Sequence, residues 1–99
     1  MVYAIFEVKK EDKSKIDSIL RDDLVSRQSI TTREASALDI DKDVIYVKIE
    51  GSEEGVRRAE ELFKEISARK LDEKEAEDIN EKIKAQDENA ALGMGNIFG

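Results

Sequence analysis

The sequence predicts an α+β fold: a two-layer sandwich in the order strand, helix, strand, strand, helix, with a three-stranded sheet, a C-terminal helix and a disordered tail. Two observations support this prediction. Up to Ile66, apolar side chains change between a spacing of two, typical of strands, and a spacing of three to four, typical of helices. After Ser67, large apolar side chains become rare. We therefore expect a core domain at residues 1–66, a loosely packed charged helix at 67–85 and a disordered tail at 86–99.

The first strand and the first helix follow from their apolar spacing. Two sets of side chains alternate at the start of the chain: Val2, Ala4, Phe6 and Val8 in one, and Tyr3, Ile5 and Glu7 in the other. This period of two predicts a strand. From Asp12 the spacing changes to three and four, over Ile16, Ile19, Leu20 and Leu24. The change predicts an amphipathic helix of about three turns, with Asp12 or Ser14 as its N-cap.

Two further strands are predicted to form a hairpin. Residues 28–38 are rich in Thr, Ser and Ala and include Ile30 and Leu38, which favours a strand at the sheet edge or partly in contact with solvent. Asp39 to Asp43 form a polar turn. Residues 44–49 then give the strongest strand pattern of the chain, Val-Ile-Tyr-Val-Lys-Ile.

The second helix is predicted to start after Gly51, which ends the third strand. Ser52 is its expected N-cap, and acidic residues follow at the positive end of the helix dipole. Its apolar face consists of Val56, Ala59, Leu62, Phe63 and Ile66.

The C-terminal helix is predicted to begin at Asp72. Leu71 stands at the position of a hydrophobic staple, and Asp72 with Glu75 has the spacing of a capping box. The apolar stripe of this helix is thin and consists of Ala76, Ile79 and Ile83. A helix with so little to bury gains little from packing, so we expect it to be loosely attached.

Composition excludes several kinds of chemistry. The chain has no cysteine and no histidine, which removes disulfides, thiolate nucleophiles, Ser-His and Cys-His pairs, and zinc sites of sulfur or imidazole. We therefore predict no catalytic group, no metal and no cofactor. The apolar segment at residues 1–8 lacks a basic leader and is followed at once by charged residues. We expect an intracellular, cytoplasmic protein without a membrane span.

The charge balance argues against unaided binding to nucleic acid. Charged residues make up 41% of the chain, and the formal net charge is −7. Lys and Arg contacts to phosphate supply most non-specific affinity for DNA or RNA, and an acidic protein offers few of them.

The high share of charged residues, without Pro or Trp, also resembles the composition of proteins from hot environments.

Two short patterns resemble ligand-binding motifs but are explained more simply by their structural roles. The acidic spacing of an EF-hand calcium loop occurs at Asp39, Asp41, Asp43 and Glu50. Val44 stands where that loop needs a glycine, so a solvated hairpin turn that tolerates αL geometry is favoured. Gly51 and Gly55 lack the lysine of a phosphate loop and are interpreted as a strand end and a small residue near a helix start.

The sheet face turned away from the two helices is the predicted protein interface. If Phe6 and Val47 point at the helices, the opposite face carries Tyr3, Ile5, Val44 and Tyr46, because side chains alternate along a strand. Such an apolar and aromatic face needs a cover. A partner or second copy is one possibility, and the C-terminal helix is the other.

A basic cluster gives the alternative function, contact with RNA. Its members are Lys9, Lys10, Lys13 and Lys15, with Arg27 and Arg33 if the fold brings them together. Residues 93–99 add three apolar side chains at the end of a polar tether. They are interpreted either as a docking peptide or as a disordered end.

The element order over residues 2–66, in which the strand Val44 to Glu50 leads into the helix Ser52 to Ile66, resembles the small dimer-forming subunit of the KEOPS tRNA-modification complex. The acidic segment from Asp72 departs from the usual ending of that family. The resemblance implies a non-catalytic subunit that dimerises and bridges enzymatic partners. We therefore expect a non-enzymatic interaction or scaffolding module that self-associates, with an RNA-associated binding domain as the alternative.

Overall fold

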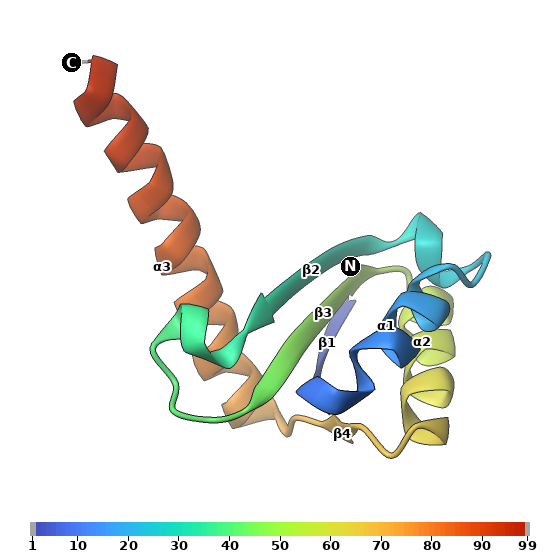
Figure 1. Cartoon of the computed structure of the whole chain (residues 1–99). Coiled ribbons are helices and arrows are strands. Elements are labelled where there is room, and N and C mark those ends of the chain that lie inside the picture. The colour runs from blue at the N-terminus through green and yellow to red at the C-terminus, as the bar shows by residue number, and fades with distance from the viewer. Residues whose placement is uncertain (1, 99) are drawn as a thin grey trace.

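The chain folds into a sheet with helices on both faces (Figure 1). In a computed structural model, the backbone is described for residues 2–98 and the side chains for residues 2–87. The strands and α-helices in that range are β1 Val2–Lys9, α1 Lys13–Leu20, β2 Ser29–Glu34, β3 Val44–Gly51, α2 Glu53–Glu65, β4 Arg69–Lys70 and α3 Glu73–Phe98. Short 3-10 turns lie between them: η1 Lys10–Asp12, η2 Val25–Arg27 and η3 Ala35–Leu38.

The strands form one antiparallel sheet in the order β2-β3-β1-β4. β1 and β3 are the central pair, with Phe6 opposite Val47. β2 pairs with the other side of β3 and forms one edge, as its sequence predicts. The α+β class and the order strand, helix, strand, strand, helix are confirmed.

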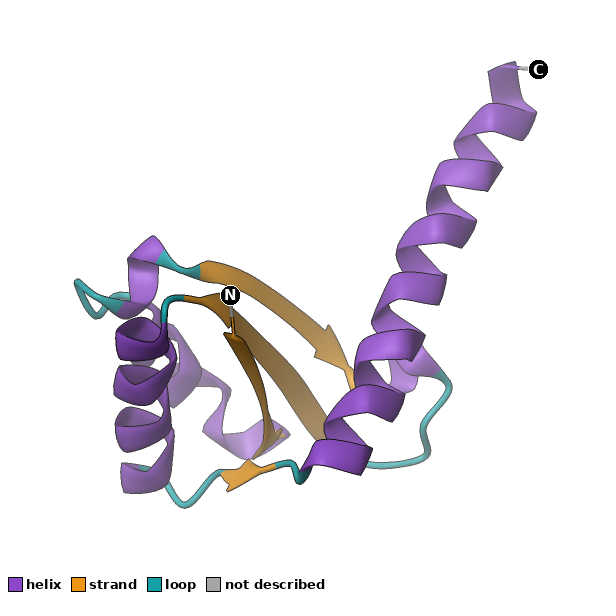
Figure 2. Ribbon diagram, turned by 180° about the vertical axis from the view of Figure 1, so that it is seen from behind, coloured by secondary structure: helices purple, strands orange, loops and turns teal. Residues whose placement is uncertain are grey.

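α1 and α2 cover one face of the sheet (Figure 2). The strand side chains on this face are Ala4, Phe6, Val8, Ile45, Val47 and Ile49. Phe6 stacks on Phe63 of α2, with their ring centroids 4.4 Å apart. Ile16 and Ile19 of α1 are buried in the same cluster. The predicted facing of β1 and β3 is therefore confirmed.

α3 covers the opposite face and adds a layer there (Figure 2). The buried side chains between α3 and the sheet are Ile5, Ala35, Leu38, Tyr46, Leu71, Ala76, Ile79 and Ile83. Of the two possible covers for this face, the C-terminal helix is the one found. The first three turns of α3 bury their thin stripe on this apolar face, and the expectation of loose packing stays a prediction.

α3 begins as the sequence predicts. The Glu75 N–H donates to Asp72 Oδ1 at 2.8 Å, and the Asp72 N–H donates to Glu75 Oε1 at 3.4 Å, which is a capping box. The tail predicted from residue 86 starts too early, since Gln86 and Asp87 contact the body of the protein. The backbone of residues 88–98 continues α3, and the docking peptide predicted at 93–99 concerns side chains outside the described residues.

Two elements are shorter than predicted. α1 has about two turns rather than three. Beyond its end, the Asp22 carboxylate accepts hydrogen bonds from the N–H groups of Leu24 and Val25 at 3.1 and 3.2 Å, and Val25 enters the core in place of Leu24. The strand predicted at 28–38 ends at Glu34, because the next four residues form η3 and bury two apolar side chains under α3.

The sheet has a fourth strand that the sequence does not predict. β4 is two residues long and pairs with β1, with Lys70 opposite Phe6 and Arg69 opposite Glu7. Two charged residues between helices carry no period of two, so only the tertiary pairing shows the strand. β4 covers part of the outer edge of β1 and leaves the rest open.

Candidate docking site at the open edge of the sheet

The predicted interface residues point to the expected face but lie under α3. The Ile5 side chain is 0% exposed and Tyr46 is 3% exposed, while Tyr3 and Val44 are half-buried. All four belong to the cluster between the sheet and α3 or pack against it. A partner reaches Ile5 and Tyr46 only after α3 has left the sheet, so these two side chains are not a docking surface of the folded protein.

Polar contacts from three strands hold α3 on the sheet. Each strand supplies one cation, and the pairs are Arg69 with Glu75 at 2.9 Å, Lys48 with Asn80 at 2.7 Å, and Arg33 with Asp87 at 2.9 Å. Arg33 also donates to Gln86 Oε1 at 2.8 Å. Arg33, predicted from the sequence to contact RNA, therefore binds α3 to the sheet.

The basic cluster predicted for RNA contact is divided by the protein's own carboxylates. Four of its six side chains form ion pairs, Lys10 with Glu34 and Asp43, Lys15 with Asp12, Arg27 with Asp23, and Arg33 with Asp87. Arg27 precedes β2 and Arg33 lies near its far end, so the fold does not bring these two together. Lys9 and Lys13 form no ion pair with the side chains that the structure describes. RNA contact stays a prediction.

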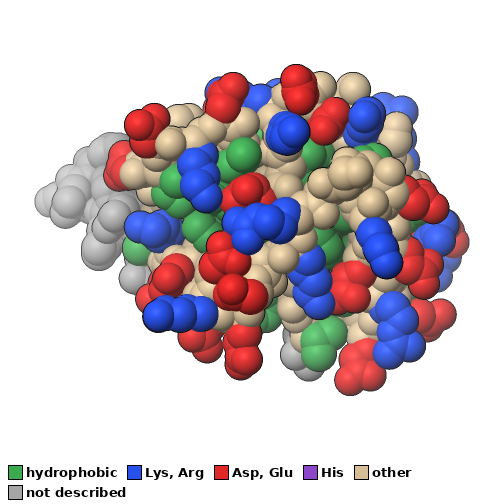
Figure 3. Space-filling view, turned by 90° about the horizontal axis from the view of Figure 1, so that it is seen from below, with side chains coloured by type: hydrophobic (Ala, Val, Ile, Leu, Met, Phe, Trp, Pro, Cys, Tyr) green, Lys and Arg blue, Asp and Glu red, His purple; other side chains and the backbone are tan. Residues whose placement is uncertain are grey.

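Charges of both signs occur together on the face that Figure 3 shows. Figure 3, which views the molecule from the side of β4, shows acidic and basic side chains interspersed rather than gathered by sign. A surface of this kind offers no continuous track for a phosphate backbone on the face shown.

The EF-hand-like spacing does not assemble into a site. Asp39, Asp41 and Asp43 lie in the connection between β2 and β3, where Asp39 has a φ of 60°, the αL geometry expected of that turn. Glu50 lies near the other end of β3, on the order of 20 Å along the strand. Among the residues whose side chains are described, no group of His, Cys, Asp or Glu is arranged to hold a metal ion.

Gly51 and Gly55 make room for one side chain, Gln28. A Cβ at Gly51 would lie 2.1 Å from Gln28 Oε1, and a Cβ at Gly55 would lie 2.2 Å from Gln28 Cδ. In that space, Gln28 Oε1 accepts a hydrogen bond from the Ser52 N–H, and its amide donates to the Leu24 carbonyl, both at 3.0 Å. The Ser52 hydroxyl caps α2 as predicted, accepting from the Gly55 N–H at 3.0 Å.

The outer edge of β1 is open where β4 ends. The last contact along this edge is the Leu71 N–H, which donates to the Ile5 carbonyl at 2.9 Å, and the chain then turns into α3. Backbone groups alternate between the two sides of an antiparallel strand, so the N–H and C=O of Tyr3 point to the same side as those of Ile5. In the described part of the chain, no backbone hydrogen bond reaches Tyr3 from this side.

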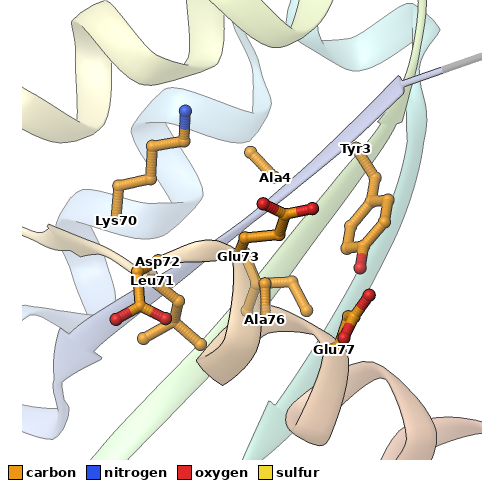
Figure 4. A pocket seen from close by; sticks show the side chains of 9 residues that line it. Tyr3, Ala4, Lys70, Leu71, Asp72, Glu73, Ala76 and Glu77 are labelled. Carbon is orange, nitrogen blue, oxygen red and sulfur yellow. The ribbon is translucent and has the colours of Figure 1, made fainter.

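A cavity lies on each side of this open edge. The first, of about 570 Å³, lies toward α3 and is lined by Tyr3, Ala4, Ile5, Lys70, Leu71, Asp72, Glu73, Ala76 and Glu77 (Figure 4). The second, of about 370 Å³, lies toward α2 and is lined by Val2, Tyr3, Glu53, Val56, Arg57, Glu60 and Lys70. Tyr3 and Lys70 line both cavities, which therefore adjoin at this edge and are together called the groove. We call them the α3-side cavity and the α2-side cavity.

Three carboxylates, those of Asp72, Glu73 and Glu77, line the α3-side cavity. The Tyr3 hydroxyl points toward the Glu77 carboxylate (Figure 4). Burial raises the pKa of Tyr3 above its usual value, and the negative charges of Glu77, Glu50 and Glu73 raise it further. Lys48 lies against the Tyr3 ring, with its Nζ 5.3 Å from the ring centroid.

Arg69 joins β1 to the first turn of α3. Its guanidinium binds Glu7 of β1 at 3.0 Å and Glu75 of α3 at 2.9 Å. Burial disfavours the charged form of Glu7, but the hydrogen bond and charge of Arg69, together with Lys42 and Tyr46, outweigh it and hold the pKa of Glu7 below its usual value. The hydrogen bond from Arg69 likewise lowers the pKa of Glu75. These contacts hold β4 and the start of α3 in place beside the open edge.

No protein-family model matches the chain, and none of the curated proteins or solved structures compared with it is similar enough to match. The resemblance to the KEOPS subunit therefore rests on element order alone. Of the described helices, none combines the length and apolar character that crossing a bilayer requires.

Proposed function

We propose that this protein is a non-enzymatic interaction module of an intracellular complex and that it binds a protein partner by strand addition at the open edge of β1. The observation that carries the proposal is the unpaired backbone at Tyr3, flanked by a cavity on each side. In strand addition, main-chain hydrogen bonds give affinity, and cavities for alternate side chains give specificity.

The exposure of Val2 supports a docking role for this edge. Val2 is the one large apolar side chain, among those described, that counts as exposed, at 36%. It lines the α2-side cavity at the start of β1. The lack of histidine and cysteine in the chain favours binding over catalysis as the use of this groove.

The other sheet edge is less suited to docking. Along β2, the outward backbone groups include the Thr32 carbonyl, which already accepts a hydrogen bond from the Arg33 guanidinium at 2.8 Å. Charged side chains at Arg33 and Glu34 also discourage pairing of this edge with another strand.

Selection from a library of random linear peptides tests the proposal without a known partner. We expect selected peptides, added to the isotope-labelled full chain, to shift the backbone amide signals of Tyr3, Ile5 and Leu71. Val2→Ser should weaken this binding because it removes the apolar contact at the edge. Thr32→Ser, which shortens an exposed side chain on the other edge strand, should leave it unchanged.

Failure to select any peptide, or signal shifts confined to α1 and α2, would overturn the proposed docking site. Light scattering on the same samples separates a partner from a second copy. Self-association that disappears in Val2→Ser would identify the occupant as a second copy of this chain.

A further inference from the structure

The positions of the two cavities determine which side chains of an added strand would face each of them. Consecutive side chains of an extended strand point to opposite faces of a sheet. One side chain of the incoming strand therefore enters the α3-side cavity, and the next one points toward the α2-side cavity. The two cavities differ in charge, so they select different side chains.

The α3-side cavity is lined by three carboxylates and one cation. Asp72, Glu73 and Glu77 line it, and none of the three forms an ion pair with a described side chain. The one cation among its lining residues, Lys70, is already paired, since it binds Glu60 of α2 at 2.7 Å. Asp72 and Glu73 also complement the dipole at the start of α3, but Glu77 lies beyond its first turn and has no such role.

The α2-side cavity is different. Its charges are balanced by two acidic and two basic side chains, and Val2 and Val56 give it an apolar part. It suits a neutral or apolar side chain better than a charged one. A second copy of the chain would bring Glu73 and Glu77 of both copies to the same edge, where like charges repel.

We infer that the partner is an extended peptide segment in which a cationic side chain, Lys or Arg, enters the α3-side cavity beside Glu73 and Glu77. The next residue is neutral and faces the α2-side cavity. This inference rests on the proposed strand addition. The carboxylates of the protein supply the charge complement, and the open edge at Tyr3 supplies the backbone contact.

Three end-blocked peptides of equal length test this inference on the full chain. In each, Thr alternates with a second residue, which is Lys, Gln or Glu. We expect the Lys peptide to bind about tenfold more tightly than the Gln peptide, with the Glu peptide weakest, and we expect added salt to reduce the difference. The amide signals of Tyr3 and Ile5 should shift in each titration that shows binding.

Two paired variants locate the preference. Glu73→Gln with Glu77→Gln should bring the affinities for the Lys and Gln peptides together. Asp78→Asn with Glu81→Gln removes the same charge from exposed positions of the same helix that do not line the cavity, and it should keep the preference.

The outcomes separate the inference from the proposed function. Equal binding of the Lys and Gln peptides, with shifts at Tyr3, would leave strand addition standing and refute the cationic partner. Binding of free spermidine as tight as that of the Lys peptide, or shifts away from β1, would show a general attraction of cations to an acidic surface and overturn the inference. If no peptide binds, both the inference and the proposed strand addition fail.

Discussion

Gln28 shows how one side chain can determine the residue types around it. Its amide joins the end of η2 to the start of α2 through hydrogen bonds to Leu24 and Ser52. Gly51 and Gly55 leave the space that this amide fills. Gly55 lies in the first turn of α2, where alanine would otherwise be favoured by about 1 kcal/mol.

A double-mutant cycle at Gln28 and Gly55 tests this arrangement. In the wild type, Gly55→Ala should displace the Gln28 amide and remove its hydrogen bonds. In a Gln28→Ala background, the same change should stabilise the protein through helix propensity. We expect Gly55→Ala to be about 1 to 2 kcal/mol less favourable in the wild type, measured by urea unfolding. Equal effects in both backgrounds would show that Gln28 does not require the glycine.

At the scale of elements, α3 decides which surfaces the protein offers. Its apolar stripe and three polar contacts cover the face that carries Ile5 and Tyr46. Because Tyr46 is buried under α3, we expect its substitution to disturb the fold. A loss of binding in such a variant would therefore not show that this face is an interface. The available surface is instead the part of the β1 edge that β4 and α3 do not reach.

Truncation after Lys70 tests the role of α3. It removes Leu71, Ile79 and Ile83, which are buried, so the free energy of unfolding should fall by about 3 kcal/mol or more. The exposed face should then cause self-association, visible by light scattering. Truncation after Asp87 keeps every described contact of α3 and should change stability little. Equal stability of the two truncated proteins would contradict this role.

Across the whole molecule, ion pairs join elements that are far apart in sequence. Asp22, which follows α1, binds Arg58 of α2 at 3.2 Å, and Arg69 joins β1 to α3 through Glu7 and Glu75. The pKa values of all three carboxyl groups lie below their usual values. For Asp22 the first cause is the hydrogen bond from the Val25 N–H, and the bond to Arg58 adds to it.

These lowered pKa values predict acid sensitivity. A carboxyl group whose pKa is lower in the folded than in the unfolded state stabilises the fold above its unfolded value, and this contribution is lost as pH falls. Stability should therefore decrease below about pH 4.5, the ordinary value of glutamate. Arg69→Gln should lower stability at neutral pH and flatten the decrease, measured by urea unfolding across the acid range. Lys74→Gln, the same charge change at an exposed position of α3, should keep the slope.

Local patterns were enough to predict most elements of this fold. The period of two gave β1 and β3 and the faces of Phe6 and Val47, and the spacing of polar residues gave the caps at Ser52 and Asp72. These features depend on residues a few positions apart, so sequence spacing carries the necessary information.

The tertiary structure alone decided the site. The two-residue β4 exists because Arg69 and Lys70 lie beside β1, and α3 is seated because Arg33 and Lys48 reach it from strands distant in sequence. With 41% charged residues, each cation has many possible partners, and only the folded chain selects among them. For the same reason, the open edge at Tyr3 has no sequence signal: it is defined by where β4 stops and α3 turns away.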